Sequence, residues 1–247
     1  MSRHDQRGAF TLTETIVAVG LVFVVAGLGA PAVHRAREAA RASACASNLR
    51  QLAFAAIAYA EENGGEFPWA MRWGKSGMEC WDYVSNGRTA RPGLLWSFVP
   101  GLDPGRVLQC PSYLEGPSNS PGDPYTGYNY NSSYVGKCEG DSGSRKRPAR
   151  LVQIKYPDRT ALFGDGQYAS GANKFMRSPV REKAYDGSGE STRLAGTQGF
   201  RHRGRTNVAF ADGHVESFGQ PFVKGGKGET APGCGFVSPD NSLYAGR

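Results

Sequence analysis

Four residues in the last third of the chain are of types that bind divalent metals or move protons: Asp165, His202, Asp212 and His214. Histidine nitrogens and carboxylate oxygens are the right ligand types for a divalent ion. The two histidines are twelve positions apart, which is not the spacing of a known metal motif. The pair Asp212-Gly213 is also what a tight turn requires. We therefore expect structural roles for these residues and no cofactor, with metal binding as the alternative.

Signatures of the common enzyme classes do not occur in the 247 residues: there is no G-x-S-x-G, no H-E-x-x-H and no phosphate-binding loop. We therefore expect no enzymatic activity. A metal-assisted hydrolase built on the histidines and aspartates above is the enzyme alternative that is left open.

A single acid, Glu14, lies just inside an apolar run from Phe10 to Val33. It is the only charged residue in those 24 positions, which are enough to span a bilayer as a helix. A carboxylate next to lipid is costly unless it has a partner, so we expect Glu14 to serve a function. A cleaved secretory signal is the alternative, because Ala30-Pro31-Ala32 offers a small-residue cleavage site. The run exceeds the roughly 7–15 residues of a signal core, which favours an anchor helix.

The stretch Gly8-Ala9-Phe10-Thr11-Leu12-Thr13-Glu14 resembles the cleavage and methylation motif of type IV prepilins. The resemblance implies that a prepilin peptidase cuts between Ala9 and Phe10 and methylates the new amino terminus. Glu14 then becomes the fifth mature residue and Pro31 the twenty-second, where pilins commonly carry a helix-bending proline. In that family the acid pairs with the Phe10 amino terminus of a neighbouring subunit, which sets the register of assembly.

A second resemblance lies near the other end of the chain. His202, nine further residues and then Asp212-Gly213 match the H-X9-DG pattern of a large prepilin-like family, type II secretion protein G-like, that is abundant in planctomycete-type bacteria. Membership of this family defines no biochemical activity. Five shorter segments are similar as well: Cys45–Leu52, Tyr59–Gly64, Phe67-Pro68, Cys110–Ser112 and Leu162–Asp165.

Alanine-rich sequence from Ala36 to Ala60 predicts that the N-terminal helix continues beyond the membrane. Asn63-Gly64-Gly65 is typical of a helix end. One apolar face follows from three- and four-residue spacing. It consists of Cys45, Leu49, Leu52, Ala53, Ala56 and Ala60.

The remaining residues are punctuated by glycine and proline, which favours short strands and loops. Asp212-Gly213 between alternating segments predicts a two-residue hairpin of type I′. Leu151–Ile154 and Thr160–Phe163 are further strand candidates, and 115–149 and 219–247 are predicted as loops.

The expected fold is therefore α+β, a long N-terminal helix packed on a small antiparallel β-rich, pilin-like domain. The segments divide as 1–9 (leader), 10–33 (membrane and filament-core helix), 34–64 (periplasmic continuation of the helix) and 65–247 (extracytoplasmic β-rich domain).

Five cysteines occur after the membrane segment, and none belongs to a C-x-x-C pair. In an extracytoplasmic, oxidising setting such cysteines form disulfides. We pair Cys45 with Cys110 first, because Cys45 lies on the apolar helix face and Cys110 precedes a proline in a turn. Cys80 with Cys138 is the second candidate pair. Fifteen arrangements of two bridges are open, so the spacing does not fix the pairing.

The net charge is +7, from 29 basic and 22 acidic residues. Basic clusters at 145–155 and 201–205 lie near several tyrosines and would suit nucleic acid. A solvated basic face explains the same residues, and we favour it, so nucleic acid is not an expected partner.

We expect a pseudopilin-like structural subunit that assembles through its N-terminal helix into a type II secretion or type IV pilus-like fibre. Its partners would be the prepilin peptidase, other pilin or pseudopilin subunits and the inner membrane. It would cross that membrane once, with the C-terminal domain in the periplasm or on an extracellular fibre. The alternative is a membrane-anchored extracytoplasmic module that binds DNA or another polyanion. Calcium, which occurs in the soluble domains of some major pseudopilins, is the ion that the resemblance allows.

Overall fold

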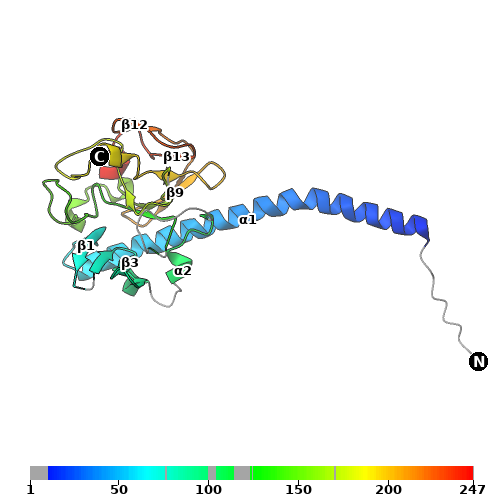
Figure 1. The fold of residues 1–247 in the computed structure, drawn as a ribbon, viewed down its shortest axis with the longest axis horizontal. Coiled ribbons are helices and arrows are strands. Elements are labelled where there is room, and N and C mark those ends of the chain that lie inside the picture. Colours follow the sequence, from blue (N-terminus) through cyan, green and yellow to red (C-terminus); the bar gives the residue numbers. More distant parts are fainter. Residues whose placement is uncertain are drawn as a thin grey trace, which may run out of the picture. The chain divides into compact units, whose positions relative to one another are not determined.

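The computed structural model describes residues 11–75, 77–99, 104–113, 123, 125–169 and 171–246. The predicted leader, with Ala9, and the predicted mature terminus Phe10 lie outside these residues. By internal contacts the chain divides into two compact units, Met1–Ala40 and Arg41–Arg247. The expected α+β class is confirmed, since a long N-terminal helix precedes several mainly antiparallel sheets (Figure 1).

Helix α1 (Leu12–Glu62) supplies the described part of the first unit. Its apolar side chains there are uncovered, with Leu12 79% exposed and Phe23 74% exposed. By length and composition the helix could cross a membrane. Pro31 lies inside it, where proline has no N–H to donate to the preceding turn.

The part of α1 in the second unit carries the predicted apolar face, and that prediction is confirmed. All six residues of the face are fully buried, from Cys45 to Ala60. Helix α1 ends as expected, because Gly64 and Gly65 adopt positive φ and the Gly65 N–H donates to the Ala60 carbonyl at 2.7 Å. Positive φ at glycine reverses the chain at no steric cost. The face joins Trp81, Tyr130 and Phe163 in the main hydrophobic core.

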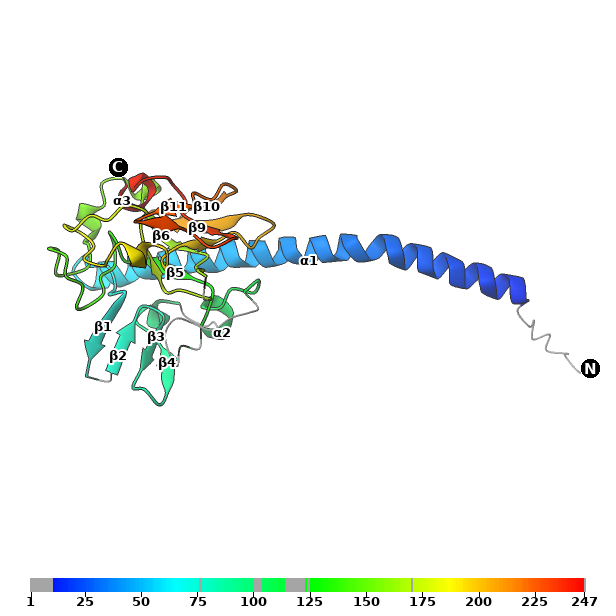
Figure 2. The ribbon, with the colours of Figure 1, turned by 45° about the horizontal axis from the view of Figure 1, so that its top comes forward.

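A four-stranded antiparallel sheet follows α1, and sequence patterns did not predict it. Its order is β1-β2-β3-β4, as Figure 2 shows. Its strands have three or four residues each, too few to display the alternation by which strands are recognised. They are β1 (Met71–Gly74), β2 (Gly77–Cys80), β3 (Tyr83–Ser85) and β4 (Ala90–Pro92).

A five-stranded sheet forms the centre of the second unit, in the order β10-β9-β6-β5-β7. All its pairs are antiparallel except β5 with β7. Its strands are β5 (Asn129–Asn131), β6 (Ala161–Gly164), β7 (Phe175–Met176), β9 (Thr206–Phe210) and β10 (Val215–Phe218).

The other elements are short. The prediction that 115–149 and 219–247 are loops throughout is wrong, because among the described residues β5 lies in the first segment and three short strands and one helix lie in the second. Two-stranded ladders pair β8 (Gln198–Gly199) with β13 (Cys234–Gly235) and β11 (Lys224–Gly225) with β12 (Gly228–Glu229). The helices are α2 (Pro104–Val107) and α3 (Ser242–Ala245), and 3-10 turns span Trp96–Phe98, Leu151–Gln153, Pro157–Arg159 and Ser191–Arg193.

Of the two further strand candidates, one is confirmed and one is wrong. Thr160–Phe163 corresponds to β6, shifted by one residue. Leu151–Ile154 is instead a 3-10 turn, in which the Ile154 N–H donates to the Leu151 carbonyl at 3.1 Å. The Gln153 side chain accepts the Arg150 N–H at 2.8 Å, which holds the turn closed.

The predicted hairpin is present, but the prediction that its turn has two residues is wrong. Val215 pairs with Ala209, and the Phe210 N–H donates to the His214 carbonyl, so the loop has three residues, Ala211 to Gly213. A type I′ turn requires positive φ at both central residues. Within the described part of the chain Arg203 is the only non-glycine residue with positive φ, so Asp212 does not meet this requirement. Gly213 alone does, which is typical of three-residue hairpin loops.

Candidate functional site

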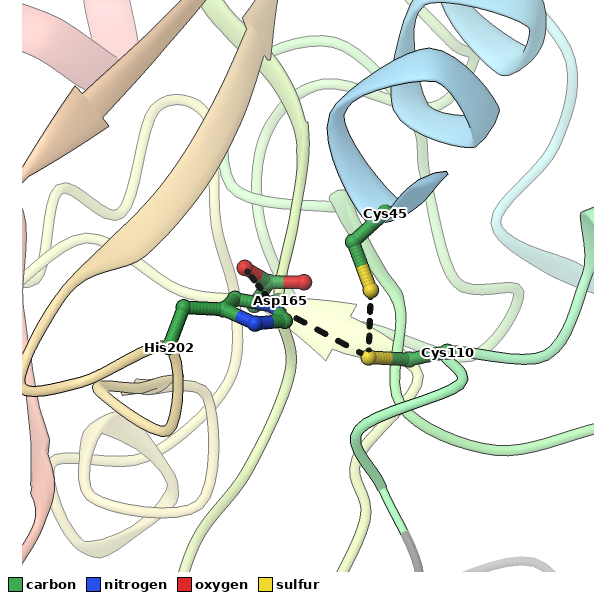
Figure 3. Close-up of side chains that lie close together, drawn as sticks. All are labelled: Cys45, Cys110, Asp165 and His202. Carbon is green, nitrogen blue, oxygen red and sulfur yellow. Dashed lines mark hydrogen bonds and ion pairs between the residues drawn. The ribbon is translucent and has the colours of Figure 1, made fainter. Parts of the chain in front are cut away.

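Four side chains from four distant segments converge inside the second unit (Figure 3). Cys45 comes from α1, and Cys110 begins the turn that follows α2. Asp165 directly follows β6, and His202 precedes the tight turn that leads into β9. Arg203 and Gly204 in that turn both have positive φ, so the chain reverses immediately after the histidine. We call these four residues the Cys-His-Asp cluster.

The ligand atoms of the Cys-His-Asp cluster all lie within 4.8 Å of one another, and all four residues are buried. The Sγ atoms of Cys45 and Cys110 are 2.8 Å apart. His202 Nε2 is 3.9 Å from Cys110 Sγ and 3.2 Å from Asp165 Oδ2. The predicted metal candidates Asp165 and His202 are thus neighbours, and the structure adds two thiols to them.

Arg201, whose side chain is 10% exposed, supplies a positive charge beside the cluster. Its Nε donates to Cys110 Sγ at 3.4 Å, and its Nη2 lies 3.4 Å from Asp165 Oδ1. The other carboxylate oxygen of Asp165 accepts the Asn207 N–H at 2.7 Å. Arg201 therefore contacts both Cys110 and Asp165, and the buried Asn207 holds Asp165 as well.

These contacts set the charges of the cluster. Burial alone would raise the pKa of Cys110, but its hydrogen bonds with Cys45 and His202 and the charge of Arg201 outweigh burial and bring that pKa down to about 5. Burial would lower the pKa of His202, yet its hydrogen bonds with Asp165 and Cys110 raise it to about 10. The pKa of Cys45 is raised by its hydrogen bond with Cys110 and by burial. The contacts therefore favour the thiolate form of Cys110 and the protonated form of His202.

The other two metal candidates lie apart from this cluster. His214 Nδ1 is 2.6 Å from Asp212 Oδ1, and both side chains are partly exposed in the β9–β10 loop. The His214 ring stacks on Phe210 with centroids 4.5 Å apart. The two ends of the H-X9-DG pattern thus have separate roles, since His202 belongs to the cluster and Asp212 to the turn. Gly213 has positive φ there, which glycine adopts without strain, and a Cβ would also approach Phe54 Cε1 to 2.6 Å.

The five cysteines are free thiols and all are buried. Cys45 and Cys110, the first predicted pair, are in contact, although the structure contains no disulfide bond between them. Cys80 and Cys138 belong to the same hydrophobic core. Both disulfides stay predictions.

Glu14 has a local role that sequence analysis missed. Its Oε2 accepts the Thr11 backbone N–H at 2.8 Å, and the Thr11 hydroxyl accepts the Glu14 N–H at 3.2 Å. This reciprocal pair is a capping box at the first turn of α1. The pattern T-x-x-E before an apolar run was the signal that could have revealed it.

Several arginines of the predicted basic clusters are used within the domain. Arg145 donates to the Val135 carbonyl at 2.9 Å, and Arg147 pairs with Glu66 at 2.6 Å. Arg201 contacts the Cys-His-Asp cluster, and Arg205 donates to the Ser217 hydroxyl at 3.0 Å. These contacts hold loops and strands together.

Comparison with known proteins gives one partial match. Residues 34–83 match the model of a family described as SBP_bac_10, protein of unknown function (DUF1559). The match covers the second half of α1 and the first strands. Cys45 lies inside it, whereas residues 8–14 and 202–213 lie outside it. No curated protein and no solved structure matches the chain significantly.

Proposed function

We propose that the chain is a membrane-anchored, pilin-like structural subunit that assembles through its N-terminal helix. The observation that carries this proposal is the exposed apolar surface of α1. Ten large apolar side chains before residue 34 are each between 48% and 79% exposed, and Glu14 is the only charge among them: Leu12, Ile16, Val17, Val19, Leu21, Val22, Phe23, Val24, Val25 and Val33.

Such a surface needs lipid or other helices to cover it. Burial stabilises at about 25 cal/mol per Å² of apolar area, so ten uncovered side chains represent a large unsatisfied driving force. A bilayer would cover these side chains before assembly, and neighbouring copies of the same helix would cover them in a fibre. A helix that only anchors the domain would be covered equally well by lipid and could use Glu14 as a cap, so the assembly role is supported by the resemblance at residues 8–14.

The assembly scheme follows the resemblance at residues 8–14. Cleavage after Ala9 would free the Phe10 amino group, and Glu14 of the next subunit would pair with it. The helix would cross the inner membrane once and present residues 65–247 on the periplasmic side. The fibre would belong to a type II secretion or type IV pilus-like system. The partial match to DUF1559 is compatible with this scheme.

Binding of DNA or another polyanion is the weaker alternative. Arg145, Arg147, Arg201 and Arg205 bond to groups of the domain itself, so these side chains are not arranged around an external ligand.

Alkaline washing of membranes from the native cell tests the anchor. The full chain should stay in the membrane pellet, because a 24-residue apolar helix is not extracted by high pH. A double variant, Val22→Arg with Val25→Arg, is the control. Each arginine at the centre of a span costs about 2.5–3.5 kcal/mol on insertion scales, so this variant should lose its membrane association. Recovery of the unaltered chain as a soluble product that begins near Val33 would contradict the anchor.

A further inference from the structure

The donor types of the Cys-His-Asp cluster specify a class of ligand. Two sulfurs, one imidazole nitrogen and one carboxylate oxygen are the ligands that zinc accepts in proteins. Calcium and magnesium take oxygen ligands almost exclusively, so a thiol pair argues against either ion here. We infer that Cys45, Cys110, Asp165 and His202 form a structural zinc site. This site goes beyond the proposed function and does not depend on it.

The separations are close to those of a tetrahedral centre. Zinc–sulfur bonds of about 2.3 Å and zinc–nitrogen or zinc–oxygen bonds of about 2.0–2.1 Å place neighbouring ligand atoms about 3.3–3.8 Å apart. His202 Nε2 already lies 3.2 Å from Asp165 Oδ2 and 3.9 Å from Cys110 Sγ. The two Sγ atoms, now 2.8 Å apart, would have to separate by about 1 Å, and the widest separations in the cluster, which reach at most 4.8 Å, would have to shorten by up to about as much.

Four protein donors and complete burial make the site structural. A catalytic zinc keeps a position open for water or substrate, whereas structural zinc is closed by four protein ligands. All four residues here are buried, with Cys45, Cys110 and Asp165 fully so. This is consistent with the expectation that the chain is not an enzyme.

Charge also balances when zinc is present. Two thiolates and one carboxylate carry three negative charges, zinc carries two positive charges, and the guanidinium of Arg201 supplies the third. Arg201 contacts Cys110 and Asp165 directly, and the Asn207 N–H bonds to Asp165. Such outer contacts orient metal ligands and are a regular part of zinc sites.

A disulfide between Cys45 and Cys110 is the competing fate of the thiols, and it excludes zinc because it removes both thiolates. A disulfide needs no histidine, carboxylate or arginine around it. Asp165, His202 and Arg201 are gathered around the two sulfurs instead, at 3.2–3.9 Å from one another or from Cys110. Zinc uses the imidazole and the carboxylate as ligands, and it ties α1 to β6 and to the loops that carry Cys110 and His202.

The test uses the full chain, purified in detergent under reducing conditions with zinc present and then freed of loose metal. Elemental analysis should find about one zinc per chain. Replacement by cobalt should give the thiolate-to-metal charge-transfer bands and the intense visible bands of a tetrahedral site, which report on the unaltered protein and need no variant.

Matched variants locate the metal. Asp165→Asn and His202→Gln should lower the zinc content to a small fraction of one per chain. Asp212→Asn and His214→Gln change the same residue types in the β9–β10 loop and should leave it at about one, as should Cys80→Ser. Circular dichroism checks that each variant is folded.

Two results would overturn the site. The first is folded, reduced protein that binds no stoichiometric zinc and gives no tetrahedral cobalt spectrum. The second is protein from its own cells that lacks zinc and yields a Cys45–Cys110 disulfide peptide. Neither result bears on the anchor or on assembly, which are measured separately.

Discussion

Replacing Glu14 with alanine should abolish assembly of the chain into fibres while leaving it anchored in the membrane. The apolar surface of α1 is unchanged by this substitution, so lipid still covers the helix. The variant lacks the carboxylate that would neutralise the amino terminus of the neighbouring subunit. An unpaired charge in a low-dielectric fibre core costs several kcal/mol, which is enough to prevent ordered addition of subunits. Chemical cross-linking of intact membranes would show the loss of the ladder of multimers.

The capping box makes controls necessary, because Glu14 also bonds to Thr11. Glu14→Gln keeps an acceptor for the Thr11 N–H and removes only the charge, so it should fail to assemble as well. Thr11→Ala removes the hydroxyl that caps the Glu14 N–H and keeps the charge. It should still assemble, with a loss of about 1 kcal/mol in helix stability. Assembly by Glu14→Gln together with failure of Thr11→Ala would show that the cap, and not the charge, is what matters.

Replacing Asp186 with alanine should destabilise the domain by about 3–5 kcal/mol, because it leaves the buried Arg193 guanidinium without its counter-ion and leaves Arg177 with only the more distant Asp141, at 3.6 Å. Its Oδ1 lies 2.9 Å from Arg177 Nη1 and its Oδ2 lies 2.7 Å from Arg193 Nη2. The Ser133 hydroxyl also donates to it at 2.5 Å. Arg193 and Asp186 are almost completely buried. Denaturant unfolding of the full chain in detergent measures the loss.

Asp158→Ala is the matched control, since this exposed residue should change stability by no more than about 0.5 kcal/mol. The same ion pairs predict that the wild-type protein loses stability in acid. Burial would raise the pKa of Asp186, but the charges of Arg177 and Arg193 outweigh it and hold that pKa well below its ordinary value. Because the carboxyl pKa is lower in the folded state, Asp186 contributes its full stabilisation at pH values above the unfolded-state pKa of about 3.9. This contribution is lost progressively as the pH falls from there toward the folded-state pKa. Equal stability of both variants would mean that the ion pairs contribute nothing.

The parts of the fold that were predictable depend on local spacing. The buried face of α1 follows from a 3.6-residue period, which any stretch of helix must obey. Its six residues, from Cys45 to Ala60, are all buried as predicted. The helix end at Gly64-Gly65 was also readable, because only glycine reverses the chain there without strain.

The unpredicted parts depend on single residues or on distant ones. The β9–β10 loop has three residues instead of two because Gly213 takes positive φ and Asp212 does not, and no pattern distinguishes these cases in advance. The strands of the first sheet, such as Tyr83–Ser85, are too short for a period to emerge.

The Cys-His-Asp cluster joins residues up to 157 positions apart, from Cys45 to His202. The residue types were visible in the sequence, and a Cys45–Cys110 disulfide was predicted from the apolar helix face that carries Cys45 and the proline that follows Cys110. The meeting of that pair with Asp165 and His202 depends on how the β6–β9 pairing sets these two residues beside α1. The spacing of these residues along the chain therefore does not predict that they meet.

The intact mass and N-terminal sequence of the protein from its own cell test the central claim most directly. If the chain is a pilin-like subunit, the mature protein begins at Phe10, carries one methyl group on that amino terminus and has lost residues 1–9. A mature protein that begins near Val33 would contradict the account, because it would have lost Glu14 and the apolar half of α1 on which assembly depends.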